Sequence, residues 1–127
     1  MTRALRIGKN GFTLLELLVA VGVLMILVAL AIPQFNAYRR RGYVAAVKSD
    51  LQNASVVQEA YFTETETYTD SLPILKSRGF RQSKGVSISV AVVDQTFTFI
   101  ATHSNCGADA WSFGGSGTIT NPSTPCQ

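Results

Sequence analysis

The chain has 127 residues, enough for one modest domain, and 46% of them are hydrophobic. Its formal net charge of +3 comes from Arg3, Arg6 and Lys9, because residues 12–127 balance eight basic against eight acidic side chains. The positive net charge therefore comes from the N-terminal tail, and it gives no reason to expect a general polyanion-binding protein.

An apolar run dominates the N-terminal third. Every residue from Leu17 to Ile32 is apolar or glycine, and the run reaches back to Phe12 with Glu16 inside it. As a helix, this stretch would be about 31 Å long, which spans a bilayer. Ala29-Leu30-Ala31 looks like a signal-peptide cleavage site, but the run is longer than a signal peptide's apolar core and continues into a helical pattern. The sequence therefore predicts a membrane-spanning helix.

Residues 9–16 read KNGFTLLE, and the apolar run that follows them ends in Ala31-Ile32-Pro33. This stretch resembles the N-terminus of a type IV pilin with a short leader. The resemblance covers about residues 1–61. It implies an inner-membrane precursor that assembles with further copies of itself, as a homo-oligomer, into a helical filament at the cell surface.

The same resemblance implies a processing site before Glu16. A basic leader, residues 1–11, would be removed between Gly11 and Phe12 by a prepilin peptidase, and Phe12 would be N-methylated. The new amino group at Phe12 and the Glu16 carboxylate would lie on one helical face, since four residues separate them. A carboxylate in lipid costs at least about 2.5 kcal/mol, so it needs a partner. That partner is its own terminus or a neighbour's, and the resemblance favours the neighbouring subunit's N-terminus.

Gly22 and Pro33 are candidate weak points of this helix. Many type IV pilins carry a glycine where this chain has Met25, and Gly22 stands three residues earlier. Proline removes one backbone hydrogen bond, but no turn residues follow it, so we expect a kinked, continuous helix over residues 12–38. In the resembled family this segment can melt when subunits pack into a filament.

Three arginines, Arg39–Arg41, follow the apolar segment. Three roles remain open for them: anchoring at the lipid headgroups, pairing between subunits, or forming a basic stripe that binds DNA. Their number equals that of the bases before the span, so the positive-inside count does not decide the orientation.

An amphipathic helix is predicted over residues 39–62. Apolar residues recur at spacings of three and four: Val44, Val47, Leu51, Ala54, Val57 and Tyr61. We expect the remaining faces to be solvated, as marked by Lys48, Asp50, Gln52, Asn53 and Gln58. The full helix would be near 50 residues, too long for a lone globular helix and suited to an assembling subunit.

Residues 63–85 break this periodicity and predict an irregular connection with a helical turn at Leu72–Lys76. The acids in and just before the connection are Glu59, Glu64, Glu66 and Asp70. Their spacing does not match an EF-hand, whose ligands alternate around a central glycine. We therefore expect a solvated loop and no metal site.

In residues 86–127 the spacing of the apolar residues changes to every second position. Residues 86–92 and 96–102 alternate and flank a short connection, and residues 110–113 and 118–120 flank a glycine-rich turn, so two hairpins are predicted. The fold class is α+β: a long N-terminal helix packed on an antiparallel sheet of about four strands. With the amphipathic helix and the connection, this sheet forms a globular head over residues 39–127.

Cys106 and Cys126 bracket the last hairpin, and their even number after an export signal favours a disulfide, with a metal pair as the alternative. His103 is the one histidine, and we find no catalytic set, phosphate loop or metal-ligand spacing, so neither enzymatic activity nor a cofactor is expected. In the resembled family, too, a disulfide closes a C-terminal loop.

Three functional classes follow. The first is a structural subunit of a type IV pilus serving adhesion, twitching motility or DNA uptake, with the prepilin peptidase and the pilus assembly machinery as its partners. The second is a pseudopilin of a type II secretion system, which shares the pattern of residues 9–33. The third is a membrane-anchored binding module that never polymerises, which Glu16 disfavours because an unassembled anchor gains nothing from a costly acid.

Overall fold

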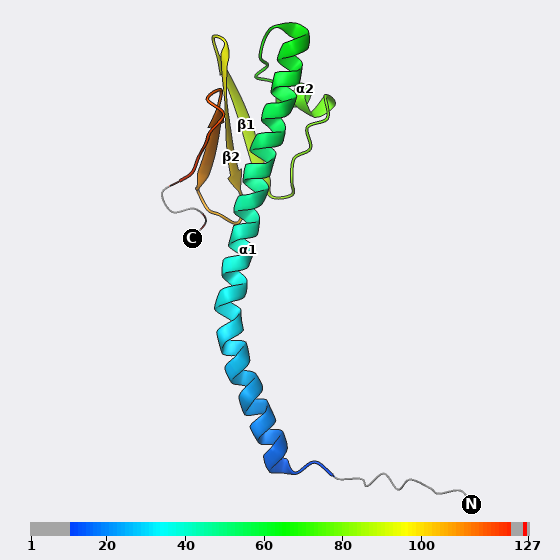
Figure 1. Ribbon diagram of the computed structural model, residues 1–127, viewed down its shortest axis with the longest axis vertical. Coiled ribbons are helices and arrows are strands. Elements are labelled where there is room, and N and C mark those ends of the chain that lie inside the picture. The colour runs from blue at the N-terminus through cyan, green and yellow to red at the C-terminus, as the bar shows by residue number, and fades with distance from the viewer. Residues whose placement is uncertain (1–10, 123–125, 127) are drawn as a thin grey trace, which may run out of the picture. The chain divides into compact units, whose positions relative to one another are not determined.

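The computed structural model describes residues 11–122 and 126. These residues form two helices and four strands (Figure 1): α1 (Leu14–Thr65), α2 (Leu72–Ser77), β1 (Val86–Val93), β2 (Thr96–His103), β3 (Ala110–Gly114) and β4 (Ile119–Thr120). The chain divides into two units, Met1–Asn36 and Ala37–Gln127, and α1 contributes to both. The second unit contains α2 and all four strands.

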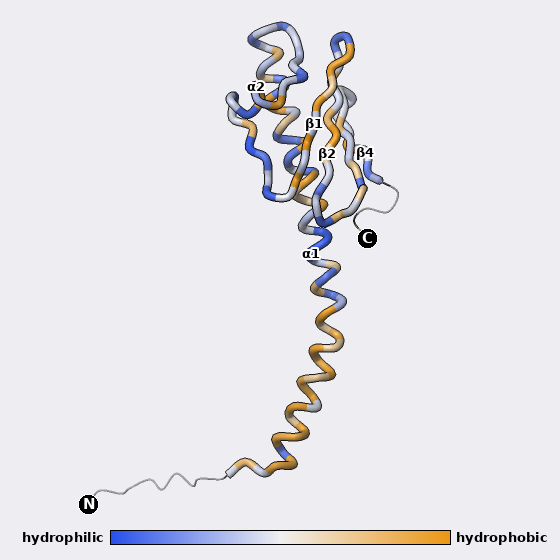
Figure 2. Tube along the Cα trace, turned by 180° about the vertical axis from the view of Figure 1, so that it is seen from behind, coloured by the Kyte–Doolittle hydropathy of each residue, from blue (hydrophilic) through white to orange (hydrophobic). Residues whose placement is uncertain are grey.

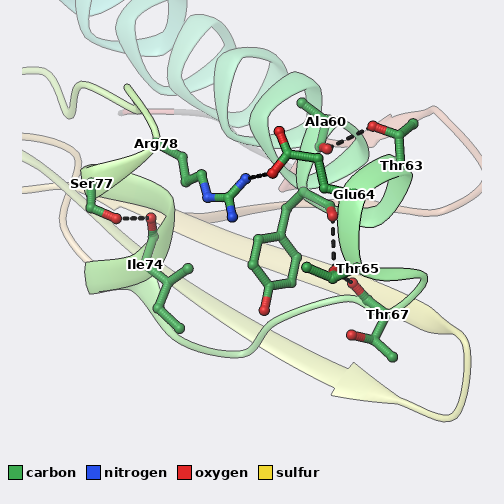
Figure 3. A network of polar contacts seen from close by, with 9 residues as sticks. Ala60, Thr63, Glu64, Thr65, Thr67, Ile74, Ser77 and Arg78 are labelled. Atoms are coloured by element: carbon green, nitrogen blue, oxygen red, sulfur yellow. Dashed lines mark hydrogen bonds and ion pairs between the residues drawn. The ribbon is translucent and has the colours of Figure 1, made fainter.

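Helix α1 contains 52 residues and continues through Pro33, as expected from the absence of turn residues after it. Figure 2 shows hydrophobic residues dominating its N-terminal half and mixed residues its C-terminal half. The helix ends at Thr65, slightly beyond the expected end at residue 62. In its last turns the hydroxyls of Thr63 and Thr65 donate to the carbonyls of Ala60 and Tyr61, at 2.7 and 2.8 Å (Figure 3).

The four strands form one antiparallel sheet in the order β1-β2-β3-β4, which confirms the predicted sheet. Strands β1 and β2 pair from Val86↔His103 to Val93↔Thr96, with Asp94 and Gln95 between them. Asp94 has φ 53°, a left-handed conformation that aspartate tolerates better than most residues. Burial alternates along β2, since side chains on a strand point to opposite faces in turn.

The core lies between α1 and one face of the sheet. Val47, Leu51 and Ala54 are fully buried on α1, in one cluster with the inward residues of the sheet: Val86, Ile88, Phe97, Phe99, Ala101, Trp111 and Phe113. The ring of Tyr43 on α1 stacks on that of His103 at 4.4 Å. Further along, the ring of Tyr68 stacks on that of Phe62 of α1 at 4.5 Å and meets that of Phe97 edge-on at 4.9 Å. Strand β2 therefore runs antiparallel to the part of α1 on which it packs.

The connection between α1 and β1 contains the short helix α2, where the sequence predicts a helical turn. Its Leu75 and the following Phe80 are buried in the core cluster. Arg78 forms an ion pair with Glu64 at the end of α1 (Figure 3). These contacts hold the connection against α1.

Two residues that we expected on solvated faces of α1 are buried: Asp50 is 1% exposed and Gln58 is 0% exposed. The prediction was wrong because the Asp50 carboxylate and the amide nitrogen of Gln58 find partners in the connection. The Asp50 carboxylate accepts from the backbone N–H and the hydroxyl of Ser83, each at 2.7 Å, and Gln58 Nε2 donates to the carbonyl of Thr69 at 2.9 Å. A buried polar group is tolerated when it is hydrogen-bonded.

Candidate functional site

The first turn of α1 contains the charged residue of the apolar run. The helix begins at Leu14, and the Thr13 hydroxyl accepts a hydrogen bond from the Glu16 backbone N–H at 3.2 Å. Thr13 is thus an N-cap, and Glu16 occupies the third helical position, where a capping box places an acid. There the carboxylate also faces the positive end of the helix dipole. A threonine three residues before a glutamate is a sequence signal of this cap, which the sequence-based prediction did not include.

Phe12 precedes the cap, so it lies outside the helix in this structure. The expectation that Phe12 and Glu16 share a helical face assumed a helix through both residues. Gly11, Phe12 and Glu16 lie within one short segment at the start of α1. Only Glu16 is in the helix, so Phe12 and Glu16 do not share a helical face. Phe12 is 75% exposed.

The apolar part of α1 has no protein around it within the described residues. Its large side chains are exposed by fractions from 42% at Val21 to 79% at Leu14. By length and composition, α1 is the one described helix that could cross a membrane. Exposure of so much apolar surface to water is unfavourable, so this segment requires lipid or other apolar helices around it.

One side of this segment carries a shallow apolar groove. Its volume is about 410 Å³, and its lining residues are Leu14, Leu17, Leu18, Val21, Gly22 and Met25. A Cβ at Gly22 would meet nothing within 4 Å, so the glycine leaves a notch in this side. At about 100° per residue, Glu16 projects from nearly the opposite side of the helix. The same segment thus presents an apolar surface and, away from it, a single carboxylate.

Two of the three arginines at the start of the second unit, Arg39 and Arg41, contact tyrosines. Arg39 Nη2 donates to the Tyr43 hydroxyl at 2.8 Å, and the Arg41 guanidinium lies 5.5 Å from the centre of the Tyr38 ring. Such cation–π contacts contribute about 0.5–1 kcal/mol at exposed sites. No carboxylate within the described residues pairs with Arg39–Arg41, so the three roles considered for them remain open.

Cys106 and Cys126 form a disulfide, as predicted. Both cysteines are buried, and the backbone N–H of Cys126 donates to Asp109 Oδ2 at 2.6 Å. The bond ties the C-terminal segment to the loop between β2 and β3. Among residues 11–122 and 126, no group of three His, Cys, Asp or Glu side chains is arranged to hold a metal ion.

Comparison with known proteins relates the chain to filament components. Residues 6–32 match the family model described as the prokaryotic N-terminal methylation motif. The chain is 33% identical over 107 residues to the type IV wide pilus major component PilA4 of Thermus thermophilus, covering 82% of this chain and 79% of that protein. It is also 33% identical over 89 residues to the type IV major pilin protein PilA of Myxococcus xanthus, of which the match covers 40%. A fimbrial protein of Pseudomonas aeruginosa is 33% identical over 64 residues, which is 50% of this chain and 42% of that protein.

Proposed function

Because the chain belongs to the type IV pilin family, whose members are structural proteins and not enzymes, we propose that it polymerises through the apolar half of α1 into a type IV pilus. One observation carries this proposal: the apolar residues of 14–32 are exposed all along this part of α1, which has no partner among the described residues. Lipid covers such a helix in the precursor, and neighbouring helices cover it in a filament. Both environments keep the apolar surface out of water.

The proposal includes processing at the start of the helix. A prepilin peptidase cuts between Gly11 and Phe12, and Phe12 is then N-methylated. The match of residues 6–32 to the methylation motif supports this step, since those residues include both sides of the bond. The Thr13 cap also supports it, because the helix begins two residues after the new terminus and leaves Phe12 accessible.

Glu16 connects the membrane and filament states. In the filament, its carboxylate pairs with the amino group of Phe12 in a neighbouring subunit. Burial of that carboxylate is then conditional on a correctly placed neighbour, since an unpaired charge in an apolar core is costly. Gly22 and Pro33 are the points at which the helix loosens on packing, because neither supports an α-helix as well as other residues do.

The assembled filament serves adhesion, twitching motility or DNA uptake at the cell surface, after an inner-membrane stage as a single-span precursor. The named relatives support a pilin over a pseudopilin, since each is described as a pilus component or a fimbrial protein. The long match to PilA4 covers most of both chains and therefore includes the head as well as the apolar helix.

Glu16→Gln tests the proposal in cells that carry a pilus assembly machinery. Glutamine retains the ability to complete a capping box but removes the charge, so the variant separates helix capping from pairing between subunits. We expect filaments, counted by electron microscopy, to be lost while the precursor accumulates normally in the membrane. Met25→Leu, which changes an apolar residue of the same helix, serves as the matched control and should assemble normally.

Wild-type filament numbers in Glu16→Gln cells would contradict the pairing of Glu16 with a neighbour. Mass spectrometry of sheared filaments tests the processing step independently. We expect a mature chain that begins at methylated Phe12. A chain that begins at Met1 or after Ala31 would contradict the proposed cleavage.

A further inference from the structure

On the part of α1 that belongs to the second unit, the basic residues come first and the glutamates last. The start of this part of the helix carries four bases, which we call the basic end: Arg39, Arg40, Arg41 and Lys48. The opposite end carries Glu59, Glu64 and Glu66, followed by Asp70. Asp94 lies at this end as well, because the turn that contains it is next to Phe97, whose ring contacts that of Tyr68. We call these five acids the acidic end.

The basic end forms a groove. Its volume is about 500 Å³, and it is lined by Ala37, Arg40, Arg41, Val44, Ala45, Lys48 and Cys126. No ion pair within the described residues involves Arg40, Arg41 or Lys48. The nearby Asp109 is engaged by the backbone N–H of Cys126. The groove therefore combines apolar walls with three positive charges that form no ion pair within the described residues.

Three carboxylates of the acidic end form no ion pair in the part of the chain that the structure describes. Glu64 pairs with Arg78 (Figure 3), and Glu59 accepts a hydrogen bond from the Tyr68 hydroxyl at 3.4 Å. Glu66, Asp70 and Asp94 are exposed and take part in no ion pair within the described residues. These three acids lie at the same end of the unit.

The two ends cannot meet within one molecule. Arg40 and Glu64 lie on the same helix, about 36 Å apart along its axis at a rise of 1.5 Å per residue. Bases and acids at this separation are well beyond a Debye length at physiological salt, so they do not neutralise each other. The acidic end can therefore pair with a basic end only in another molecule.

We propose that the acidic end of one copy docks on the basic groove of a second copy that is displaced along the helix axis by about the length of the head. This inference rests on the proposed function, because a filament supplies such displaced copies. Glu66, Asp70 and Asp94 face Arg40, Arg41 and Lys48 of the next copy in this arrangement. Complementary charge fixes the register between copies, since a wrong register places like charges together.

Zero-length cross-linking of wild-type filaments tests the contact directly. A carbodiimide joins an amine to a carboxylate only when the two groups touch. Lys48 is the amine of the groove, and it lies about 24 Å along α1 from Glu64 of its own chain, with Glu66 beyond the end of the helix. A cross-linked peptide that joins Lys48 to Glu66 must therefore come from two copies. We expect this peptide by mass spectrometry, and its absence from filaments in which other lysines are cross-linked would overturn the proposal.

A charge swap provides the second test. Reversing the basic end with Arg40→Glu and Arg41→Glu should lower filament yield at least about tenfold, because like charges then face each other across the contact. Reversing the acidic end with Glu66→Lys and Asp94→Lys should do the same. Combining the two reversals should restore filaments. The control variant combines Lys76→Glu with Arg81→Glu, which changes the net charge as much as the first reversal. Both positions are exposed and lie outside the basic end, so this variant should assemble normally.

The outcomes separate this contact from the function on which it rests. If the wild-type chain forms no filaments, the proposed function fails. If it forms filaments and both reversals leave the yield unchanged, the docking of acidic end on basic groove is wrong while the filament stands. Failure of the combined swap, with every variant present in the membrane at wild-type amounts, would likewise overturn it.

Discussion

Both oxygens of the Asp50 carboxylate accept hydrogen bonds from Ser83. Oδ1 accepts from the Ser83 hydroxyl and Oδ2 from its backbone N–H, each at 2.7 Å, across 33 positions of the chain. Asp50 lies on α1 between the core residues Val47 and Leu51, and Ser83 lies three residues before β1. This pair therefore fixes the point at which the connection returns to the sheet.

Asp50→Ala should lower the free energy of unfolding by about 2–4 kcal/mol, since hydrogen bonds to a charged group contribute about 1.5–3 kcal/mol each and are not additive. Urea unfolding of the full chain in detergent, followed by circular dichroism, measures this. Ser83→Ala and the double variant complete a mutant cycle. Additive losses in that cycle would show that the two residues are not coupled.

Thr13→Val should destabilise the start of α1 by about 1 kcal/mol, because valine has nearly the same shape but no oxygen to accept the Glu16 N–H. Hydrogen exchange at the amides of the first turn reports this as faster exchange confined to residues 14–17. Thr13→Ser keeps the hydroxyl and is the matched control. Equal protection in the valine and serine variants would contradict the capping role.

Gly85→Ala should destabilise the head by about 1–3 kcal/mol. Gly85 has φ +84°, and a Cβ there would lie 3.0 Å from Nε2 of the buried His103. Gly115→Ala is the control, because its Cβ would meet nothing within 4 Å. Thermal unfolding compares the two variants, and equal melting temperatures would show that the space beside His103 is not tight.

Reduction of the Cys106–Cys126 disulfide should cost roughly 3 kcal/mol, the chain-entropy value for a loop of this length. The pair Cys106→Ser and Cys126→Ser should lose the same amount, and a reductant should then have no further effect on the variant. Urea titrations with and without reductant measure both. A reductant-sensitive serine variant would show that the reductant acts elsewhere.

The pKa of Tyr68 is raised above its ordinary value of 10.0, first by desolvation and then by the nearby negative charge and hydrogen bond of Glu59. The native state therefore holds this proton more tightly than the unfolded state. The resulting stabilisation is fully present below pH 10 and is lost as the pH rises through the folded-state pKa. Tyrosinate absorbance should show one late-titrating tyrosine that disappears in Tyr68→Phe. Unchanged titration in that variant would contradict the assignment.

Local patterns predicted most of the fold. The unbroken apolar run predicted the exposed half of α1, the three-and-four spacing from Val44 to Tyr61 predicted its inward face, and period-two alternation predicted the β1–β2 hairpin. Each of these patterns depends on neighbours within a few residues, because helix and strand periods are local properties of the backbone. The residues that we propose for processing and assembly, Gly11, Phe12 and Glu16, also came from one short stretch.

The roles of Asp50, Gln58 and His103 depend on residues far away in the sequence. Asp50 occupies a position three residues after Val47, so the spacing alone put it near the apolar face, yet its charge argued for solvent. A buried carboxylate is stable only where donors meet it, and its donors come from Ser83. By itself the sequence determined the elements and the apolar helix, since both follow from local periodicity. Only the tertiary structure decided which polar groups are buried and that Asp94 lies at the same end of the head as Glu64, because both depend on how distant segments pack together.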